Sequence, residues 1–404
     1  MIARQAVHAR QRKILRLAII VSHPIQYYVP LYQRLARRTD LELKVFFTWH
    51  SAQGPVEDRG FRRSVAWDIP LTDGYAFESI PNTAAQPGTH HFTGLRNPHL
   101  IERVSAWNPD VVQVTGWAWQ SHLRALQAFS RRSVPTLFRG DSHLLDPAPP
   151  APRPWIKKAA LRRVFAWPTG FLVVGSANSA YYEAFGVGNE RLFPCPHSID
   201  VRRFAQPSGE LEQRAAGWRQ QLGIGPHRTV LLFAGKFEPK KRPVELMLAV
   251  QALQDPDLLL LLVGDGELAP RINAIAAADP GRFRVLPFQN QSRMPIVYRL
   301  GDLFVLPSAY GETWGLSVNE AMACGRPVLV SDRVGCASDV VDPSSGRVFV
   351  SGAPDGLLRS LAELAKGRNQ LTCMARSAAQ RAWNFDIGRT ETTLVDALER
   401  VCQR

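Results

Sequence analysis

Short, continuously apolar runs alternate with helical stretches, and this alternation occurs twice along the chain. A run such as Leu258–Val263 (LLLLLV) is apolar at every position, which is typical of a strand covered on both faces of a parallel sheet. Parallel strands need crossover connections, and the helical stretches supply them. With 404 residues the chain is long enough for two cores. The sequence therefore predicts an α/β protein of two Rossmann-like, doubly wound parallel-sheet domains.

The elements expected in the first half follow from these runs. The predicted strands are Leu17–Ser22, Leu43–Thr48, Val111–Thr115, Thr136–Arg139 and Phe171–Gly175. The predicted helices are Tyr28–Arg38, Trp119–Arg131, Pro154–Ala166 and Ala177–Phe185. Residues 51–94 show no period, and we expect a long loop or a short hairpin near the cleft there. The PAPPAPRP run from Pro147 is interpreted as a stiff connector.

The pattern breaks after His197-Ser198-Ile199-Asp200 and starts again beyond a polar stretch, helical or linker-like, at 207–226. The strands predicted there are Thr229–Ala234, Leu258–Val263, Arg284–Phe288, Leu303–Leu306 and Val328–Val330. The corresponding helices are Pro243–Gln254, Ala269–Ala278, Met294–Arg299 and Leu316–Ala323. We place an N-terminal domain at 1–205 and a C-terminal domain at 206–384.

The segment from Pro307 to Asp332 has the layout of a binding site. It joins a strand, a glycine-containing turn, a helix start near Gly315, Leu316 and Ser317, and a second strand. Free amide groups at a helix start suit a phosphate. Carboxylates such as Glu312 and Glu320 do not favour an anion by charge, so we expect them to accept hydrogen bonds from sugar hydroxyls. A nucleotide sugar carries both groups.

Glu320 has an alternative interpretation. Ser317-Val318-Asn319-Glu320 matches the capping-box pattern, in which the glutamate reaches back to its own helix start. Glu312 lies in a loop between two glycines and has no comparable local role.

The spacing Glu312-x7-Glu320, with Gly315 and the continuation EAMACGRPVLVS, resembles the signature of family-4 retaining glycosyltransferases of the GT-B fold. The resemblance implies two domains facing a central cleft, with Glu312 on the donor sugar and Glu320 on the nucleotide ribose. Backbone amides between them would hold the diphosphate. The last helix, within 385–404, would cross back to the N-terminal domain. Retention of configuration follows from the resemblance alone.

The leaving diphosphate needs cations. No convincing Asp-x-Asp motif is present, so we expect neither a metal nor another cofactor. FAGKFEPKKRP supplies Lys236 directly after a strand and Lys241 at the next helix start. The resemblance places this pair on the β-phosphate; the alternative is an ordinary charged turn. It also implies that the nucleobase lies near Phe288 to Gln291, where Arg293 reaches the base or a phosphate. The sequence does not identify the nucleobase of the donor, and UDP and GDP are the favoured nucleotides.

Several N-terminal residues complete the predicted site. His23 and Gln26 follow the first strand, where the family often has two glycines, and we expect them to contact the donor. Arg139 stands where the family often has a histidine, and Arg139 and Asp141 are predicted to act at the sugar's reacting face. The residues predicted at the acceptor, with packing or loop polarity as the alternative, are Trp117, Trp119 and His143.

The net charge of +14 and pI near 10.0 indicate an anionic partner or a genomic arginine bias. Arg153 to Pro168 (RPWIKKAALRRVFAWP) is either a membrane-surface helix or a solvated basic one. No nucleic-acid-binding signature is recognisable, and nucleic acid is not an expected partner. Five scattered cysteines argue for a reducing compartment, and we read the start as a basic tail before a buried strand. We expect a cytoplasmic protein, with the inner membrane face as a candidate docking surface.

These observations together predict a metal-independent, retaining hexosyltransferase that acts on a glycan or a lipid-linked acceptor in cell-surface polysaccharide or glycoconjugate biosynthesis. Two alternatives stay open: a nucleotide-sugar epimerase of GT-B architecture, and a basic nucleic-acid-binding Rossmann protein. A dehydrogenase is disfavoured because no G-x-G-x-x-G follows a predicted strand.

Overall fold

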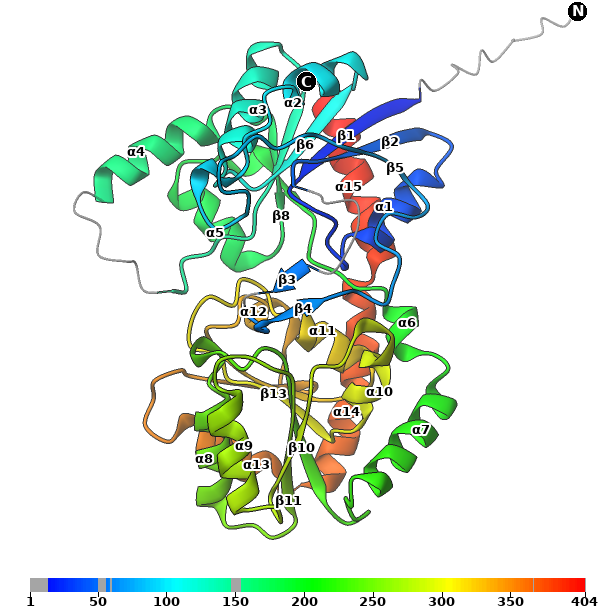
Figure 1. Cartoon of the computed structure of the whole chain (residues 1–404), viewed down its shortest axis with the longest axis vertical. Helices are drawn as coiled ribbons and strands as arrows, with labels where there is room; N and C mark the ends of the chain where they lie inside the picture. The colour runs from blue at the N-terminus through cyan, green and yellow to red at the C-terminus, as the bar shows by residue number, and fades with distance from the viewer. Residues whose placement is uncertain (1–13, 50–55, 59, 147–153, 366, 404) are drawn as a thin grey trace, which may run out of the picture.

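The computed structural model describes residues 14–49, 56–58, 60–146, 154–365 and 367–403. Two parallel sheets, each covered by helices, follow one another along the long axis of the molecule (Figure 1). The basic N-terminal tail, the PAPPAPRP connector up to Arg153, and part of the 51–94 segment lie outside the described residues. Nothing in the described part of the chain forms a helix long and apolar enough to cross a bilayer.

The first sheet has seven strands in the order β5-β2-β1-β6-β7-β8-β9. Their bounds are β1 Leu15–Val21, β2 Leu41–Phe47, β5 Ala76–Ser79, β6 Val111–Thr115, β7 Thr136–Arg139, β8 Gly170–Val173 and β9 Leu192–Pro194. The helices of this half are α1 Val29–Ala36, α2 Leu100–Ala106, α3 Gln120–Arg131, α4 Pro154–Phe165 and α5 Ser176–Ala184. Between β2 and β5 the chain leaves the sheet and forms an antiparallel pair, β3 (Val56–Asp58) and β4 (Arg63–Val65).

The second sheet has six strands in the order β12-β11-β10-β13-β14-β15. They are β10 Thr229–Ala234, β11 Leu258–Val263, β12 Phe283–Leu286, β13 Leu303–Leu306, β14 Val328–Ser331 and β15 Gly346–Phe349. The helices are α6 Val201–Ala205, α7 Ser208–Gln221, α8 Pro243–Leu253, α9 Ala269–Ala278, α10 Met294–Arg299, α11 Leu316–Ala323, α12 Ala337–Val340, α13 Gly356–Ala365 and α14 Arg368–Ala382.

Continuous apolarity has a direct structural cause in β10. Successive side chains of a strand point to opposite faces of the sheet. Val230 and Leu232 accordingly pack into one hydrophobic cluster, whereas Leu231 and Phe233 pack into another on the opposite face. All six residues of β10 are buried. The same division separates Leu17, Ile19 and Val21 from Ala18 and Ile20 in β1. The expected fold of two doubly wound parallel sheets is confirmed.

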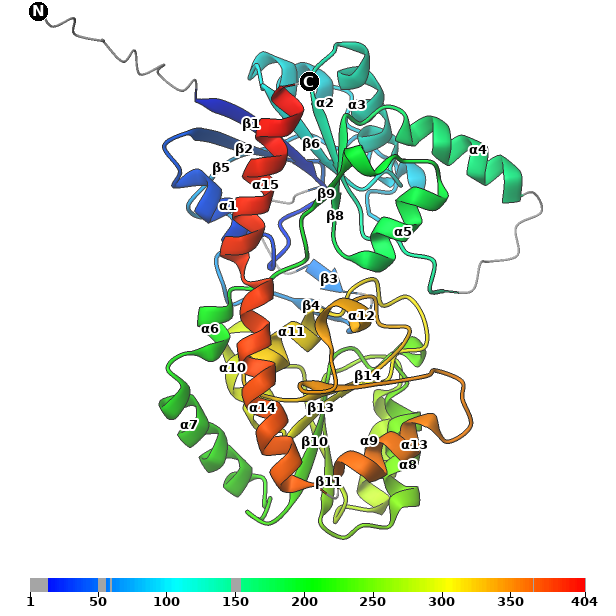
Figure 2. The same ribbon diagram turned by 180° about the vertical axis from the view of Figure 1, so that it is seen from behind.

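Within the described residues, two connections join the two halves. The first passage follows β9 and leads into α6, and the second joins α14 to α15 (Ile387–Cys402). Ile199 and the second passage are joined by backbone hydrogen bonds, since Ile387 N donates to Ile199 O at 2.9 Å and Ile199 N donates to Phe385 O at 3.2 Å. Figure 2 shows α14 against the lower half and α15 against the upper one, where α15 contacts α1 and β9.

The predicted elements missed the sheet edges. β5 and β9 lie at the two edges of the first sheet and β15 at one edge of the second. Each is only three or four residues long, and β5 (AFES) has no residue buried on either face. A short edge strand lacks the continuous apolarity that marks a central one, so its sequence does not distinguish it from a loop.

Candidate active site

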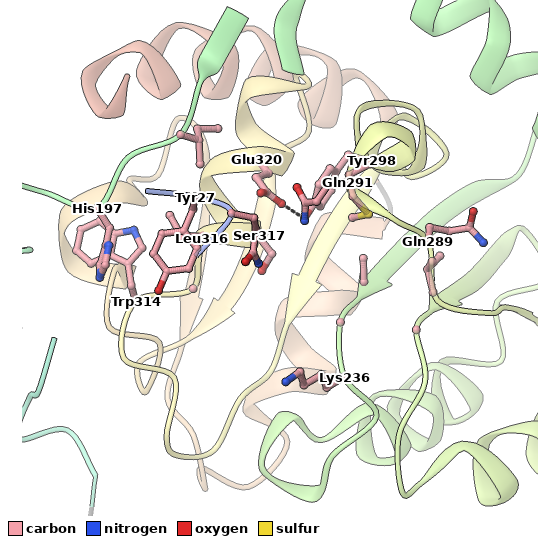
Figure 3. Close-up of a pocket in the computed structure, with 18 of the residues that line it drawn as sticks. Tyr27, His197, Lys236, Gln289, Gln291, Tyr298, Trp314, Leu316, Ser317 and Glu320 are labelled. Carbon is pink, nitrogen blue, oxygen red and sulfur yellow. Dashed lines mark hydrogen bonds between the residues drawn. The ribbon is translucent and has the colours of Figure 1, made fainter. Parts of the chain in front are cut away.

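A cavity of about 420 Å³ lies between the two halves. Figure 3 shows part of its lining, with residues from both halves of the chain facing one space. Of the sequence-predicted residues, the cavity is lined by Gln26, Asp141, Lys236, Lys241, Phe288, Glu312, Gly315, Leu316, Ser317 and Glu320. The loops that follow β10, β12 and β13, together with α11, provide most of these residues, in agreement with the rule that ligands bind beyond the carboxyl ends of parallel strands.

Glu312 and Lys241 form an ion pair in the cavity wall. Lys241 ends a 3₁₀ turn after β10, and Glu312 lies in the loop between β13 and α11. Lys241 Nζ is 2.5 Å from Glu312 Oε2, and Ser308 Oγ donates to the same oxygen at 3.2 Å. Burial raises the pKa of Glu312, but Lys241 and the hydroxyl outweigh burial and hold this pKa below its usual range. The pair therefore places a carboxylate and an ammonium group together at the ligand space.

The start of α11 presents backbone amides to the same space. Gly315 has φ = 95°, in the left-handed region that glycine tolerates best. A Cβ atom on Gly315 would also lie 2.8 Å from Val334 Cγ1. Both constraints require glycine at this sharp turn into α11. The first amides of a helix have no partner within the helix, so they are directed outward at its start. Leu316 and Ser317 are the first residues of this helix and line the cavity.

Glu320 does not form the capping box. Helix α11 is capped at Gly315 without a side-chain hydrogen bond, and Ser317 is already inside the helix. The Glu320 carboxylate instead accepts a hydrogen bond from the Tyr298 hydroxyl at 2.5 Å, and both residues line the cavity (Figure 3). Burial raises the pKa of Glu320 to about 7, against the opposing effect of the Tyr298 hydrogen bond. The capping-box alternative is therefore wrong.

Two predicted donor residues point away from the cavity. The Arg293 guanidinium lies 5.7 Å from the ring centre of Trp218 and donates to Gln289 Oε1 at 3.3 Å. His23 Nδ1 is 2.9 Å from Ser22 Oγ, and its ring meets Trp49 edge-on at 5.6 Å. Neither residue lines the cavity. The expectation of direct donor contacts for both is corrected.

Arg139 is a core residue. Only 4% of it is exposed. Its guanidinium donates to the Tyr28 hydroxyl at 3.2 Å and to the Cys195 carbonyl at 2.8 Å. It therefore ties β7 to α1 and β9 beneath the cavity, and the catalytic placement made from its position at a strand end is corrected.

The predicted acceptor residues are half-buried in the N-terminal half. Trp119 Nε1 donates to Thr89 O at 3.1 Å, and its ring meets His122 edge-on at 5.0 Å. Trp117 packs on the cluster around β6 and β7. His143 Nδ1 accepts from Leu145 N at 3.2 Å. The cavity lining includes none of these three residues, so their contact with an acceptor stays a prediction.

Asp141, like Gln26, is a predicted N-terminal residue that lines the cavity, and its carboxylate contacts the other half of the chain. Its Oδ2 accepts a hydrogen bond from Thr313 Oγ1 at 2.9 Å, one residue after Glu312. The contact brings the strand end of β7 within reach of the loop that carries the first glutamate.

The sequence reading missed a cluster of rings around His197. Tyr27 and Trp314 each lie 5.8 Å from its ring, and Figure 3 shows the three side chains together on one side of the cavity. His197 is 3% exposed, and its Nδ1 is buried with no hydrogen-bond partner in the described part of the chain. Burial, reinforced by Arg139, holds the pKa of His197 well below its usual range, so the ring is neutral. Its position in the linker between the two sheets was the signal available in the sequence.

Within the described ranges, no group of three or more histidine, cysteine, aspartate or glutamate side chains is arranged to hold a metal ion.

Known proteins match this chain in sequence and in fold. The profile of the glycosyl transferases group 1 family matches residues 216–381. A D-inositol 3-phosphate glycosyltransferase of Salinispora tropica is 32% identical over 211 residues, which cover 49% of this chain and 44% of that protein. The Nocardia farcinica protein of the same name is 30% identical over 260 residues, covering 61% and 56%. The chain thus spans about half the length of these curated relatives.

Among solved structures, Anabaena HepE in complex with UDP and glucose superposes with a TM-score of 0.70 at 16% identity, over 96% of this chain and all of that one. At this identity the likeness establishes the fold. The family match covers the region from β10 to β14, which includes Lys236 and Lys241 after β10, Glu312 after β13 and Glu320 in α11. Residues 216–381 therefore match the glycosyl transferases group 1 family, and the chain as a whole has the GT-B fold.

Proposed function

We propose that the chain is a retaining hexosyltransferase that moves a sugar from a nucleoside diphosphate sugar to a glycan or a lipid-linked acceptor. The observation that carries the proposal is the Glu312–Lys241 pair beside the start of α11 in the interdomain cavity. Uracil is the first base to test, in the form of UDP and UDP-sugars, because HepE was solved with UDP and with UDP-glucose.

The geometry suggests how the donor would be held. The diphosphate would lie between the amides of Leu316 and Ser317 and the ammonium groups of Lys236 and Lys241. Negative charge grows on the leaving phosphate as the glycosidic bond breaks, and preorganised cations and amides stabilise that charge. A bound diphosphate would share Lys241 with Glu312, which leaves the carboxylate able to accept hydrogen bonds from the sugar. Glu320 would accept from the ribose hydroxyls while Tyr298 fixes its orientation.

A product screen tests this assignment. The protein is incubated with UDP-, GDP- and ADP-sugars and with acceptors of three kinds: glycans, polyprenyl-linked sugars and inositol phosphate, the last suggested by the names of the relatives. Glu312→Ala is expected to lose transfer, and Glu210→Ala, an exposed glutamate on α7, is the matched control. Epimerisation or hydrolysis of the donor without transfer to any acceptor would overturn the transferase assignment.

We further propose a cytoplasmic location with docking on an anionic membrane face through α4. Trp155 and Ile156 are 68% and 43% exposed on this helix. The helix carries four exposed cations and no acidic residue; the cations are Lys157, Lys158, Arg162 and Arg163. An exposed apolar start beside a basic face suits the interface of an anionic bilayer. Co-sedimentation with phosphatidylglycerol vesicles, but not with phosphatidylcholine vesicles, is expected to depend on Trp155 and Ile156.

A further inference from the structure

Residues 60–68 belong to the first half of the chain but lie on the second. They form the end of the excursion between β2 and β5, and Figure 1 shows β4 beneath the upper sheet, against the lower half. Asn290 Nδ2 donates to Ala66 O at 2.6 Å, and Ser292 N donates to Asp68 Oδ1 at 3.1 Å. The Ser292 hydroxyl also donates to the Asp68 carboxylate. The excursion is therefore anchored to the loop between β12 and α10.

These anchors fix the residue between them. Ala66 and Asp68 are both held by the loop after β12, and Trp67 between them lines the cavity. Its ring centre is 6.3 Å from that of Phe288, and the ring of Phe61 is 4.7 Å from the same residue. Two rings from the N-terminal half thus meet one ring from the C-terminal half at the cavity wall.

The excursion also approaches the lysine proposed to hold phosphate. Lys236 Nζ is 5.0 Å from the ring centre of Phe61. A Cβ atom on Gly60 would lie 2.5 Å from Lys236 Cδ and 2.7 Å from Glu238 Oε1, so a residue with a side chain would force these groups to move. The rings of Phe61, Trp67 and Phe288 form an aromatic wall that therefore lies next to the part of the cavity proposed to hold the phosphates. A nucleotide, with a base at one end and phosphates at the other, could extend from one to the other.

The chemistry of this wall fits a flat heterocycle. Phe61, Trp67 and Phe288 provide ring faces, and Gln289 and Gln291 line the same cavity with amide groups. Aromatic rings hold nucleobases by stacking on their π faces, and amides hydrogen-bond with their edges. In Figure 3, Gln289 lies on one side of the cavity and His197 with Trp314 on the other, with Ser317 and Glu320 between them.

We propose that Phe61 and Trp67 complete the nucleobase site of the donor, with the Trp67 ring stacking on the base and Asp68 as its positioning residue. This proposal rests on the proposed function, because it assumes a nucleoside diphosphate in the cavity. The base site is then built from both halves of the chain, with Phe288, Gln289 and Gln291 from the C-terminal half and Phe61 and Trp67 from the N-terminal half.

Calorimetric titration with two ligands tests the proposal. UDP carries the base, and inorganic pyrophosphate carries only the phosphates. In the full-length chain, Trp67→Ala is expected to weaken UDP binding by about five- to a hundredfold, the scale of one base–aromatic stack. Pyrophosphate binding should stay within about twofold of the parent, because the same stack contributes nothing to it. Trp67→Phe should restore most of the UDP affinity, and Trp383→Ala, a partly exposed tryptophan between α14 and α15, is the matched control.

Two results would overturn the proposal. Equal UDP affinity in the parent and in Trp67→Ala would show that the ring does not contact the base. Equal losses for UDP and pyrophosphate would assign the excursion to joining the halves rather than to stacking. Phe61→Ala provides a second variant should Trp67→Ala fail to fold, with the same expected selectivity for UDP. A parent chain that binds none of UDP, GDP and ADP would instead refute the proposed function itself, so the two failures are distinguishable.

Discussion

Lys236, Lys241, Glu312 and Glu320 are charged groups that the C-terminal half brings to the cavity, beside the rings of Phe288, Tyr298 and Trp314. The N-terminal half brings the Asp141 carboxylate and the rings of Tyr27, Phe61 and Trp67. Tyr27 follows β1, Phe61 and Trp67 come from the excursion between β2 and β5, and His197 comes from the linker. Both halves have the same parallel-sheet architecture. The difference therefore lies in the loops that line the cavity: those of the C-terminal half carry the charged groups proposed to hold the donor's phosphates and sugar, and those of the N-terminal half carry the rings of Tyr27, Phe61 and Trp67.

The polar residues at the strand ends of the two halves also have different surroundings. After β10 and β13 the chain turns directly onto the cavity, so Lys236 and Glu312 meet the ligand space. In the N-terminal half, the Arg139 side chain at the end of β7 is buried and donates to the Tyr28 hydroxyl, whose ring packs with those of Tyr32 and His197. The side chains of Lys236 and Glu312 therefore face the cavity, whereas Arg139 is held in the core of its own half.

The largest expected effect is on the charged side of this comparison. Lys241→Ala should lower kcat/KM by about 100- to 1000-fold, because one preorganised contact to the leaving phosphate contributes about 3–4 kcal/mol to transition-state stabilisation. Steady-state kinetics with the donor found in the screen measures it, with Arg376→Ala, an exposed cation on α14, as the control. A decrease in kcat/KM smaller than about fivefold would show that Lys241 does not contact the leaving phosphate.

A stability effect is expected at Arg139 in the N-terminal half. Arg139→Met leaves the Tyr28 hydroxyl and the Cys195 carbonyl without their donor. An unsatisfied buried polar group costs about 1–3 kcal/mol, so the free energy of unfolding should fall by about that amount. Denaturant titration measures this change. The kcat/KM of the folded variant should stay within about threefold of the parent value. A hundredfold loss of kcat/KM at unchanged stability would show that Arg139 acts in catalysis after all.

A smaller activity effect is expected at His197. His197→Phe keeps the ring contacts with Tyr28 and Trp314 but removes Nδ1, which has no protein partner among the described residues. We expect kcat/KM to fall about tenfold, the equivalent of one hydrogen bond to the substrate. An unchanged kcat/KM in this variant would mean that Nδ1 does not contact the substrate. Because the pKa of His197 is lowered, activity above pH 6.5 should not follow its protonation.

The smallest expected effect is a pH dependence at Glu320. Its pKa near 7 means that the carboxylate that would accept the ribose hydroxyls forms as the pH rises from 6 to 8. UDP-glucose should bind up to about tenfold more tightly over this range, and Glu320→Gln should abolish the trend. A parent chain with the same slope as the variant would contradict the assignment.

The same pKa shift of Glu320 has an opposite consequence for stability. Between its ordinary pKa of 4.5 and its value near 7, the folded chain holds a proton that the unfolded chain has released. This contribution to the free energy of unfolding is present below pH 4.5 and decreases as the pH rises towards 7. Denaturant titrations of the parent and Glu320→Gln at pH 5 and pH 8 isolate this contribution. If the two proteins differed in their free energy of unfolding by the same amount at both pH values, the pKa shift of Glu320 would be contradicted.

Patterns local in the sequence predicted most of the fold and the charged part of the site. The central strands β10, β11 and β13 begin and end where their apolar runs do. Gly315 and the start of α11 also follow from local constraints, since a tight turn into a helix demands glycine. The short edge strands and the orientation of Arg139, His23 and Trp119 depend on distant neighbours, and the single sequence carries no record of those neighbours.

The amino-acid sequence by itself determined the two parallel sheets and the positions of the lysines and glutamates, because buried strands, helix starts and strand-end loops are set by residues close together in the chain. Tertiary structure alone decided which rings share that space. Trp67 and Phe288 are separated by more than two hundred residues and meet only because the excursion after β2 crosses to the other half. His197 likewise reaches the cavity because the linker passes between the sheets.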